Sequence, residues 1–308
     1  MSIAVAGYGA VGRAVTARLV ARGERVTVIQ RSDPGTLPEG ARFVPADAVT
    51  GEGLARALGD AHTLICAVGL PYSGKVFRRD WPRLADSCLD ACAATGARFL
   101  LADNLYMYGP QTAPLHEDMP LAGGGDKPRA RAEVTRRWQA AHAAGKVMAC
   151  ALRAADFYGP DAPNSMLVGQ GIQRLLAGKP AMMAFPVDHP HDYTYVPDFA
   201  RAIELLLDAP EADWGQAWHV PNAPTQTTRE LLAQAADIAG VDLRITILPD
   251  PMRRLLGLFV PVLAELGEMR FQWDRPYHVD AAKFVQRFGD APTAFAEGLT
   301  TTIAANRR

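Results

Sequence analysis

The sequence predicts an α/β fold: a doubly wound parallel sheet with a smaller, interleaved C-terminal substrate lobe. Three observations lead to this prediction. They are a glycine-rich turn close to the N-terminus, an alternation of apolar runs with amphipathic segments, and runs that are apolar throughout. The alternation is typical of successive strand–helix–strand units. A strand that is apolar on both faces indicates a parallel sheet covered by helices on each side.

The first strand–helix–strand unit contains the turn Gly7-Tyr8-Gly9-Ala10-Val11-Gly12. The turn follows an apolar run, opens a segment with apolar residues at helical spacing, and precedes a second apolar run at 26–29. In this context a G-x-G-x-x-G turn binds the pyrophosphate of a dinucleotide. Gly7 permits the tight turn, Gly9 lets the pyrophosphate approach, and Gly12 allows close helix–strand packing. We therefore expect all six residues of the turn to contact a cofactor.

The end of the second apolar run predicts which dinucleotide binds. An NAD-specific site carries an acidic residue at this strand tip, where it accepts a hydrogen bond from the ribose 2′-hydroxyl. Here the tip is Arg31 and Ser32, and Asp33 lies beyond it. The guanidinium of Arg31 suits a 2′-phosphate, and Arg13 is either a second cation for it or a solvated helix residue. We expect NADP(H) rather than NAD(H), with Arg31 and Ser32 among its contacts.

Four further apolar runs extend the sheet, and helical segments separate them. The expected strands are 42–47, 63–69, 98–102 and 147–152, and the expected helices are 53–58, 81–95 and 128–143. Ligands of such sheets bind outside the carboxyl ends of the strands. Asp47, Ala67, Val68 and Gly69 fall on that edge, so we expect them to contact the cofactor. The cofactor-binding core then covers 1–160, and 161–308 is mainly the substrate-binding lobe, with 191–207 returning to the core.

Composition narrows the class of protein. The chain has 308 residues, 49% of them hydrophobic, and its 32 basic and 33 acidic side chains give a formal net charge of −1. This balance leaves no excess of positive charge to attract a polyanion, so neither a nucleic acid nor a membrane surface is expected as a partner. The four cysteines lack metal-binding spacing, and the apolar runs are too short to span a membrane. We expect a cytoplasmic protein that binds a small-molecule substrate and no metal. Whether it forms a homodimer is left open.

Three later motifs point to a family. Tyr108-Gly109-Pro110 follows the run 98–102, Tyr158-Gly159-Pro160 follows the run 147–152, and Tyr195-Val196-Pro197-Asp198 opens a late helix. With the glycine turn, they resemble the extended short-chain dehydrogenase/reductases, the NAD-dependent epimerase/dehydratase group, over residues 2–207. The resemblance implies a Rossmann sheet and a dinucleotide cofactor. It implies no single reaction, because the group includes epimerases, dehydratases, reductases and non-catalytic members.

The chain departs from this family at the catalytic positions. Family enzymes usually use a serine or threonine, a tyrosine that transfers the proton, and a lysine that lowers the pKa of that tyrosine. Here Asn104 occupies the serine position, Gly125 the tyrosine position and Arg129 the lysine position. The segment 121–138 contains no tyrosine, so a shift of register does not restore the motif.

These departures leave several interpretations. In the first, catalysis is rebuilt: Tyr106 or Tyr108 is the acid/base, Asn104 orients the carbonyl, and Arg129 or Lys127 lowers the phenol pKa. The protein is then an NADP(H)-dependent oxidoreductase or epimerase acting on a small or medium-sized organic substrate. In the second, it senses the cofactor without turnover. A ketopantoate-reductase-like dehydrogenase shares the glycine-turn opening, but the tyrosine motifs count against it.

The later part of the chain carries further polar candidates and one long apolar stretch. The resemblance places Tyr158 beside the nicotinamide. It leaves Asp156 open between a hydrogen bond to the substrate and a loop cap. His191 and Tyr193 are expected to be structural. The stretch 252–271 is apolar on one face, and we expect that face to pack inside the lobe.

Overall fold

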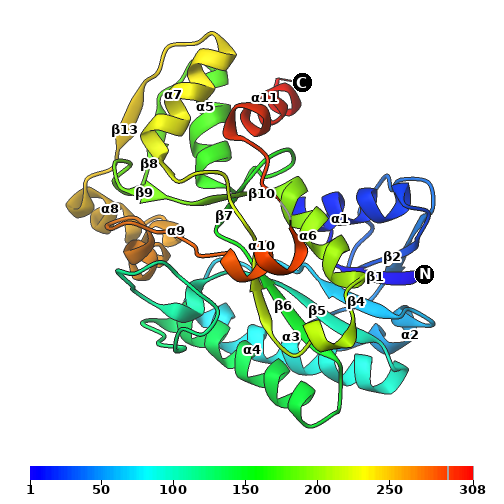
Figure 1. Cartoon of the computed structure of the whole chain (residues 1–308). Helices are drawn as coiled ribbons and strands as arrows, with labels where there is room; N and C mark the ends of the chain where they lie inside the picture. Colours follow the sequence, from blue (N-terminus) through cyan, green and yellow to red (C-terminus); the bar gives the residue numbers. More distant parts are fainter. Residues whose placement is uncertain (290, 308) are drawn as a thin grey trace. The chain divides into compact units, whose positions relative to one another are not determined.

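The computed structural model describes residues 1–289 and 291–307 (Figure 1). The described residues form two compact units, and each unit is assembled from separate stretches of the chain. The first unit comprises Met1–Met107, Leu121–Arg153 and Phe199–Trp218; the second comprises Tyr108–Pro120, Ala154–Asp198 and His219–Arg308. The chain therefore leaves the first unit and returns to it twice. The predicted roles of 1–160 as cofactor core and 161–308 as substrate lobe stay predictions.

A seven-stranded sheet forms the centre of the first unit. Its strands are β1 (Ser2–Ala6), β2 (Arg25–Gln30), β3 (Ala41–Pro45), β4 (Thr63–Cys66), β5 (Arg98–Asp103), β6 (Ala149–Arg153) and β11 (Ala217–His219). They lie in the order β11-β6-β5-β4-β1-β2-β3. All pairs formed among β1 to β6 are parallel. This is the strand order of a doubly wound Rossmann sheet, so the predicted fold class is confirmed.

Helices cover both faces of this sheet (Figure 1). They are α1 (Ala10–Ala21), α2 (Leu54–Leu58), α3 (Gly74–Thr95), α4 (Asp126–Ala143) and α6 (Val196–Leu207), with the short 3₁₀ helices η1 (Tyr106–Tyr108) and η3 (Glu211–Asp213). Helices α2, α3 and α4 share one buried apolar cluster with the strands. On the other face, ion pairs join α1 to α6 through Arg18 with Glu204 and Arg22 with Asp208.

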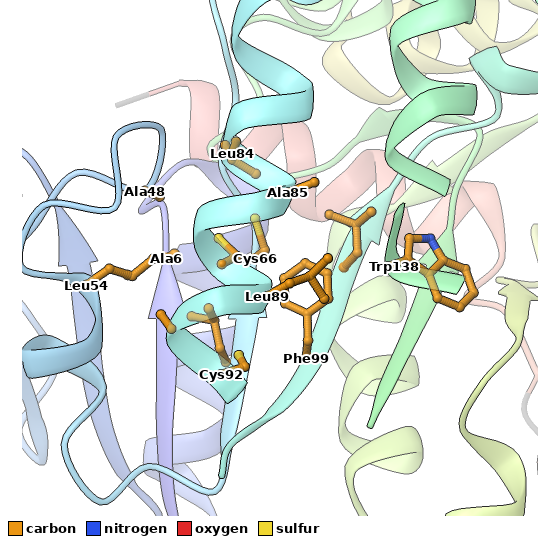
Figure 2. Close-up of a cluster of buried hydrophobic side chains, with 14 of the residues drawn as sticks. Ala6, Ala48, Leu54, Cys66, Leu84, Ala85, Leu89, Cys92, Phe99 and Trp138 are labelled. Carbon is orange, nitrogen blue, oxygen red and sulfur yellow. The ribbon is translucent and has the colours of Figure 1, made fainter. Parts of the chain in front are cut away.

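The apolar cluster beneath α3 is the core of one face (Figure 2). Side chains alternate along a strand, so every second residue of β1, including Ala6, points toward α3. Cys66, Leu84 and Phe99 in this cluster are at most 1% exposed. Burial raises the pKa of the Cys92 thiol to about 12. That thiol is therefore protonated at neutral pH and packs as a small apolar side chain.

The predicted elements of the first unit are present, and two of them differ from the prediction by more than two residues at one end. Strand β4 ends at Cys66 rather than Gly69. Helix α3 begins at Gly74 rather than at Trp81, and it carries Pro82 inside it. Phe77 is only 4% exposed, so packing against the core holds the additional helical turns that precede the proline. Tertiary packing has overridden the local stop signal.

The second unit contains short strands and small helices. The strands are β7 (Asp156–Tyr158), β8 (Ala181–Met183), β9 (Pro190–His191), β10 (Tyr193–Tyr195), β12 (Gln226–Thr227) and β13 (Ile245–Ile247). They form three two-stranded sheets, β10-β7, β12-β9 and β13-β8. The helices are the π-helix η2 (Met166–Ile172), α5 (Gln173–Leu176), α7 (Thr228–Ala239), α8 (Asp250–Gly257), α9 (Pro261–Glu265), the 3₁₀ helix η4 (Gly267–Gln272), α10 (Ala282–Phe288) and α11 (Phe295–Asn306).

The expectation that the apolar face of 252–271 packs inside the lobe is wrong for most of its length. Pro261 divides the stretch, because it takes the first position of α9 and leaves α8 to end at Gly257. Between the two helices, Leu258 is 76% and Phe259 is 79% exposed. Over the described residues, no helix is both long and apolar enough to cross a membrane.

Candidate active site

The glycine turn between β1 and α1 has the geometry of a phosphate cradle. Gly7 has φ of +90°, and a Cβ placed there would lie 2.6 Å from the Ala67 carbonyl oxygen. A Cβ on Gly12 would collide with the carbonyl oxygen of Gly7, whereas a Cβ on Gly9 would meet nothing within 4 Å. Gly9 is the N-cap of α1 and provides no side-chain cap for its first turn. Backbone N–H groups of that turn therefore remain for an anion in the open space beside Gly9.

The chain after β4 borders the same turn. Strands β1 and β4 are neighbours although four elements separate them in sequence, so the sheet reverses its strand order between them. Such a switch point is where ligands bind in doubly wound sheets. The N–H of Ala67 donates to the carbonyl of Ala6 at 2.8 Å. The structure thus brings the predicted residues Ala67, Val68 and Gly69 to the edge that carries the glycine turn.

The tip of β2 carries a cation and no available carboxylate. Arg31 is exposed, and the described residues include no ion-pair partner for it. Ser32 beside it is exposed as well, and its carbonyl accepts from the Gln30 amide at 2.8 Å. Asp33 is engaged locally, because its Oδ1 accepts the N–H of Gly35 at 2.8 Å. Arg13 lies 4.6 Å from the centroid of the Tyr8 ring, next to the glycine turn.

Asp47 follows β3 and shapes its own loop. Its Oδ1 accepts the N–H of Val49 at 2.7 Å and that of Thr50 at 3.3 Å. This is the local hydrogen bonding of an Asx turn. Asp47 therefore stands at the predicted edge of the sheet, with one carboxylate oxygen committed to the turn.

The predicted catalytic segment after β5 is divided between the two units. Asn104 Oδ1 accepts the N–H of Tyr106 at 3.1 Å, which fixes the start of η1, and both side chains are partly exposed. Tyr108 belongs to the second unit and is fully buried there. Its hydroxyl lies 2.8 Å from His219 Nε2, and His219 Nδ1 lies 3.2 Å from the Leu115 carbonyl oxygen. Since a carbonyl only accepts, Nδ1 carries the proton and Tyr108 donates to Nε2.

The start of α4 places its two candidate cations in opposite environments. Gly125 is the N-cap of the helix. The side chain of Arg129 is 70% exposed, donates to the Gly125 carbonyl at 3.1 Å and pairs weakly with Asp126. Lys127 is fully buried, and its ammonium lies 4.6 Å from the ring centroid of Tyr72. Tyr72, which sequence reasoning missed, follows β4 on the loop that leads to α3.

A buried charged cluster behind this edge was also missed. Asp103, the last residue of β5, pairs with Arg131 of α4 and lies 3.5 Å from Nε of Arg153, the last residue of β6. All three side chains are at most 1% exposed. The Arg131 guanidinium also lies 3.8 Å from the ring centroid of Trp81. Lysine and arginine four residues apart on α4 were the signal that could have indicated one shared face.

Tyr158 lies in the second unit and is closely packed. It is 1% exposed, and its ring lies 5.2 Å from that of Tyr195 and 5.6 Å from that of Phe295. Burial, and to a smaller extent the charge of Asp198, raises its pKa. Its hydroxyl has no hydrogen-bond partner among the residues described. Its expected place beside a nicotinamide stays a prediction.

The sheet order and the glycine turn define a dinucleotide-binding Rossmann protein. Comparison with family models refines this class, because the model described as "NAD dependent epimerase/dehydratase family" matches residues 3–220. The chain belongs to that family, which confirms the resemblance seen in its motifs. A search of curated proteins found no match.

Solved structures show the same fold at low sequence identity. A UDP-glucuronic acid 4-epimerase from Bacillus cereus, in complex with UDP-glucuronic acid and NAD, matches with a TM-score of 0.83 and 17% identity, covering 99% of each chain. A dTDP-glucose 4,6-dehydratase from Streptomyces venezuelae, with NAD bound, has a TM-score of 0.82 and 20% identity, covering 100% of this chain and 97% of that one. A UDP-glucose 4-epimerase from Thermus thermophilus, in complex with NAD, has a TM-score of 0.78 and 22% identity, covering 100% and 99%.

Proposed function

We propose that the protein binds NADP(H) at the carboxyl edge of the first unit's sheet and uses it as an oxidoreductase or epimerase on a small or medium-sized organic substrate. The glycine turn carries this proposal. Gly7 and Gly12 leave no room for a side chain, whereas open space lies beside Gly9 at the N-terminus of α1. This arrangement fits a pyrophosphate. When bound, the nicotinamide supplies hydride transfer.

The preference for the phosphorylated cofactor rests on the tip of β2. The relatives named above were solved with NAD. Here Arg31 occupies the tip, and Asp33, the first carboxylate after it in the sequence, is already bonded to the N–H of Gly35. A guanidinium favours a 2′-phosphate over a 2′-hydroxyl, because it donates forked, charge-assisted hydrogen bonds.

Calorimetric titration with NADPH and NADH tests this preference. We expect NADPH to bind at least about tenfold more tightly, since hydrogen bonds to charged groups are worth about 1.5–3 kcal/mol. Arg31→Ala should remove most of that difference and leave NADH affinity nearly unchanged. Arg136→Ala, at an arginine of α4 whose side chain is 57% exposed, is the matched control. Tighter binding of NADH, or unchanged NADPH affinity in Arg31→Ala, would refute the preference.

We assign proton transfer to Tyr106. It follows the carboxyl end of β5, it is partly exposed, and Asn104 holds its backbone at 3.1 Å. Hydride delivery to a carbonyl leaves negative charge on the oxygen, and the Tyr106 hydroxyl would donate its proton there. The Asn104 amide would orient the same oxygen. Tyr108 suits this role less well, because its hydroxyl is buried and bonded to His219.

Lys127 is the better of the two candidate cations for stabilising a phenolate in this site. Its ammonium is buried, so water does not screen it, whereas the side chain of Arg129 is 70% exposed. Tyr72, whose ring lies below that ammonium, is the competing phenol. On an identified substrate, Tyr106→Phe should lower kcat by about 10²–10⁴ and leave NADPH affinity unchanged, whereas Tyr72→Phe should retain most of the activity. The opposite result would move the role to Tyr72.

The cofactor-sensing alternative rests on Gly125 and Arg129, which replace the family's tyrosine and lysine. Assays with a panel of carbonyl compounds and sugar nucleotides separate the two functions. Tight NADPH binding without turnover of any of them would favour the sensor. Membership of the epimerase/dehydratase family argues against a ketopantoate-reductase-like dehydrogenase.

A further inference from the structure

The exposed apolar side chains of the second unit gather on one hairpin. Among the described residues, Met1 is the single large apolar side chain that the first unit exposes. Helices α8 and α9 of the second unit, with the turn between them, form a helical hairpin over residues 250–265 (Figure 1). A continuous apolar cluster on a surface usually marks a binding site. The exposed apolar side chains of the hairpin are Met252, Leu255, Leu256, Leu258, Phe259, Val260 and Val262.

Close contacts between its two helices brace the hairpin. A Cβ placed on Gly257 of α8 would lie 3.1 Å from the backbone nitrogen of Ala264 in α9, so the two backbones approach closely there. Arg253 is 4% exposed, and its Nη1 donates to the Leu263 carbonyl at 2.9 Å. The apolar tip is therefore held in one conformation before any partner binds, which lowers the entropy cost of binding.

The turn at the tip pairs its backbone donors within the hairpin. The N–H groups of Leu258, Phe259 and Val260 donate to carbonyls of α8 at 2.8–3.2 Å. Pro261, the next residue, has no N–H. Unpaired backbone donors are costly in hydrocarbon, where no water can bond to them. The tip can therefore leave water without losing hydrogen bonds at these four positions.

Polarity is graded along the hairpin. Asp250, at the start of α8, pairs with Arg253 and with Arg270, so its carboxylate is engaged at the base. Arg254 is exposed, and the described residues provide no ion-pair partner for it. Side chains of a helix lean toward its N-terminus, so the Arg254 side chain leans away from the tip and toward the base. An exposed cation therefore stands between a charged base and an apolar tip.

This distribution fits a lipid bilayer better than a second copy of the chain. Protein interfaces carry a polar rim and about one hydrogen bond per 100–200 Å². Between residues 250 and 265, all of them described, Arg254 is the one exposed charged side chain, so two facing hairpins would bring together two unpaired cations. Lipid phosphates lie between water and hydrocarbon. An arginine next to an inserted apolar tip reaches that level.

We propose that the hairpin inserts its tip into one leaflet of a membrane and that Arg254 contacts the lipid phosphates. The apolar side chains provide the affinity, because insertion removes their surface from water. The balanced charge of the chain led us to expect no membrane partner, and that expectation did not consider exposed apolar surface. The interaction is independent of the proposed reaction, since it uses no residue of the cofactor site.

Flotation of the full chain with large unilamellar phosphatidylcholine vesicles tests the proposal. We expect the wild type to bind, and Leu258→Ser/Phe259→Ser should weaken binding by about tenfold or more, because two apolar side chains no longer leave water. Val285→Ser, at an exposed valine of α10 in the same unit, is the matched control and should bind as the wild type does. No binding of the wild type, an unchanged double variant, or an equal loss in Val285→Ser would overturn the proposal.

Vesicles that contain phosphatidylglycerol test the role of Arg254. At low salt, Arg254→Ala should lower the affinity for these vesicles by about fivefold and leave binding to pure phosphatidylcholine nearly unchanged. High salt should remove this difference, because it screens the surface charge. Arg136→Ala, at an arginine whose side chain is 57% exposed, is the control and should have no effect. An Arg254→Ala variant with full affinity at low salt would overturn the contact with phosphate.

A label at the tip distinguishes insertion from self-association. All four cysteines are buried, so a maleimide dye reacts selectively with the thiol introduced in Phe259→Cys. We expect the emission of an environment-sensitive dye there to shift to the blue with vesicles and to be quenched by brominated acyl chains, whereas the same dye in Val285→Cys should not respond. Sedimentation velocity without lipid measures self-association. A dimer that Leu258→Ser/Phe259→Ser abolishes, with no response of the dye to vesicles, would assign the hairpin to a second copy and overturn the proposal.

Discussion

Each unit departs from the usual distribution of side chains between core and surface. The first unit buries charged side chains, and the second exposes apolar ones. In the first unit, Lys127, Arg131 and Arg153 are no more than 1% exposed. In the second, Leu258 and Phe259 are more than three-quarters exposed. Lysine and arginine are almost never fully buried unless they are paired, and contiguous exposed apolar residues usually mark a binding surface.

The buried cations and the exposed apolar side chains differ in their neighbours. The buried cations of the first unit have partners: Asp103 for Arg131 and Arg153, Trp81 for the Arg131 guanidinium, and Tyr72 for the ammonium of Lys127. No described residue covers the exposed apolar side chains of the second unit. The buried charges therefore depend on particular partners, whereas the exposed apolar residues contribute little to the stability of their own unit.

The largest expected effect comes from removing the carboxylate of Asp103. Asp103→Ala leaves two buried guanidiniums without their counter-charge, so we expect the free energy of unfolding to fall by about 3–5 kcal/mol. Urea denaturation followed by circular dichroism measures it. Asp90→Ala, at an exposed aspartate paired with Lys146, is the control and should cost less than about 1 kcal/mol. Equal losses in the two variants would mean that burial does not distinguish these ion pairs.

A smaller loss is expected when the aromatic partner is removed. Trp81→Leu keeps an apolar side chain but withdraws the ring face from the Arg131 guanidinium, 3.8 Å away. We expect a loss of about 1–3 kcal/mol, because a desolvated cation–π contact is worth about 2 kcal/mol and the smaller side chain leaves space. Trp81→Phe, which keeps a ring face, should recover part of the loss. No difference between the two variants would rule out a contribution from the ring.

Lys127 should separate stability from activity. Lys127→Met replaces a buried ammonium with an apolar chain of similar length, so unfolding free energy should change by no more than about 1 kcal/mol in either direction. If the ammonium supports catalysis, NADPH-dependent turnover should still fall on a substrate that the wild-type enzyme converts. Denaturation and steady-state kinetics on the same preparation measure both. A stable variant with full turnover would limit Lys127 to a packing role.

The smallest effect is expected on the exposed apolar residues. Phe259→Ser should change the free energy of unfolding by no more than about 0.5 kcal/mol, because the side chain is already 79% exposed. Phe284→Ser, at a fully buried phenylalanine of the same unit, should cost about 3–5 kcal/mol. Thermal and urea denaturation provide the comparison. A large loss in Phe259→Ser would show that this residue is covered in the folded protein.

Local signals explain what the sequence could predict. Gly7 and Gly12 are recognisable because only glycine fits where a Cβ would strike the backbone, and that requirement repeats across Rossmann turns. The strands could be predicted because they are apolar runs bounded by turns that contain glycine or proline. The error in α3 was not local, since the packing of Phe77 against the core extends the helix on the N-terminal side of Pro82.

Contacts between distant segments explain what the sequence could not predict. The cluster of Asp103 with Arg131 and Arg153 depends on how β5, α4 and β6 pack, and no spacing in the chain encodes that. The partner of His191, Asp156, lies on a different strand. The periodicity of 252–271 identified an amphipathic stretch correctly, but periodicity does not say whether a partner covers the apolar face.

The interleaved connectivity of the first unit affects how this unit folds during translation. Most of helix α6 and of strand β11 comes from the stretch Phe199–Trp218, which follows the excursion Ala154–Asp198 into the second unit. At about 5–20 residues per second, that excursion takes roughly 2–9 s to translate. During this interval α1 lacks the ion pairs to α6, and one face of the sheet lacks a helix. A nascent chain stopped at residue 160 therefore exposes apolar surface to chaperones and proteases that the finished chain conceals.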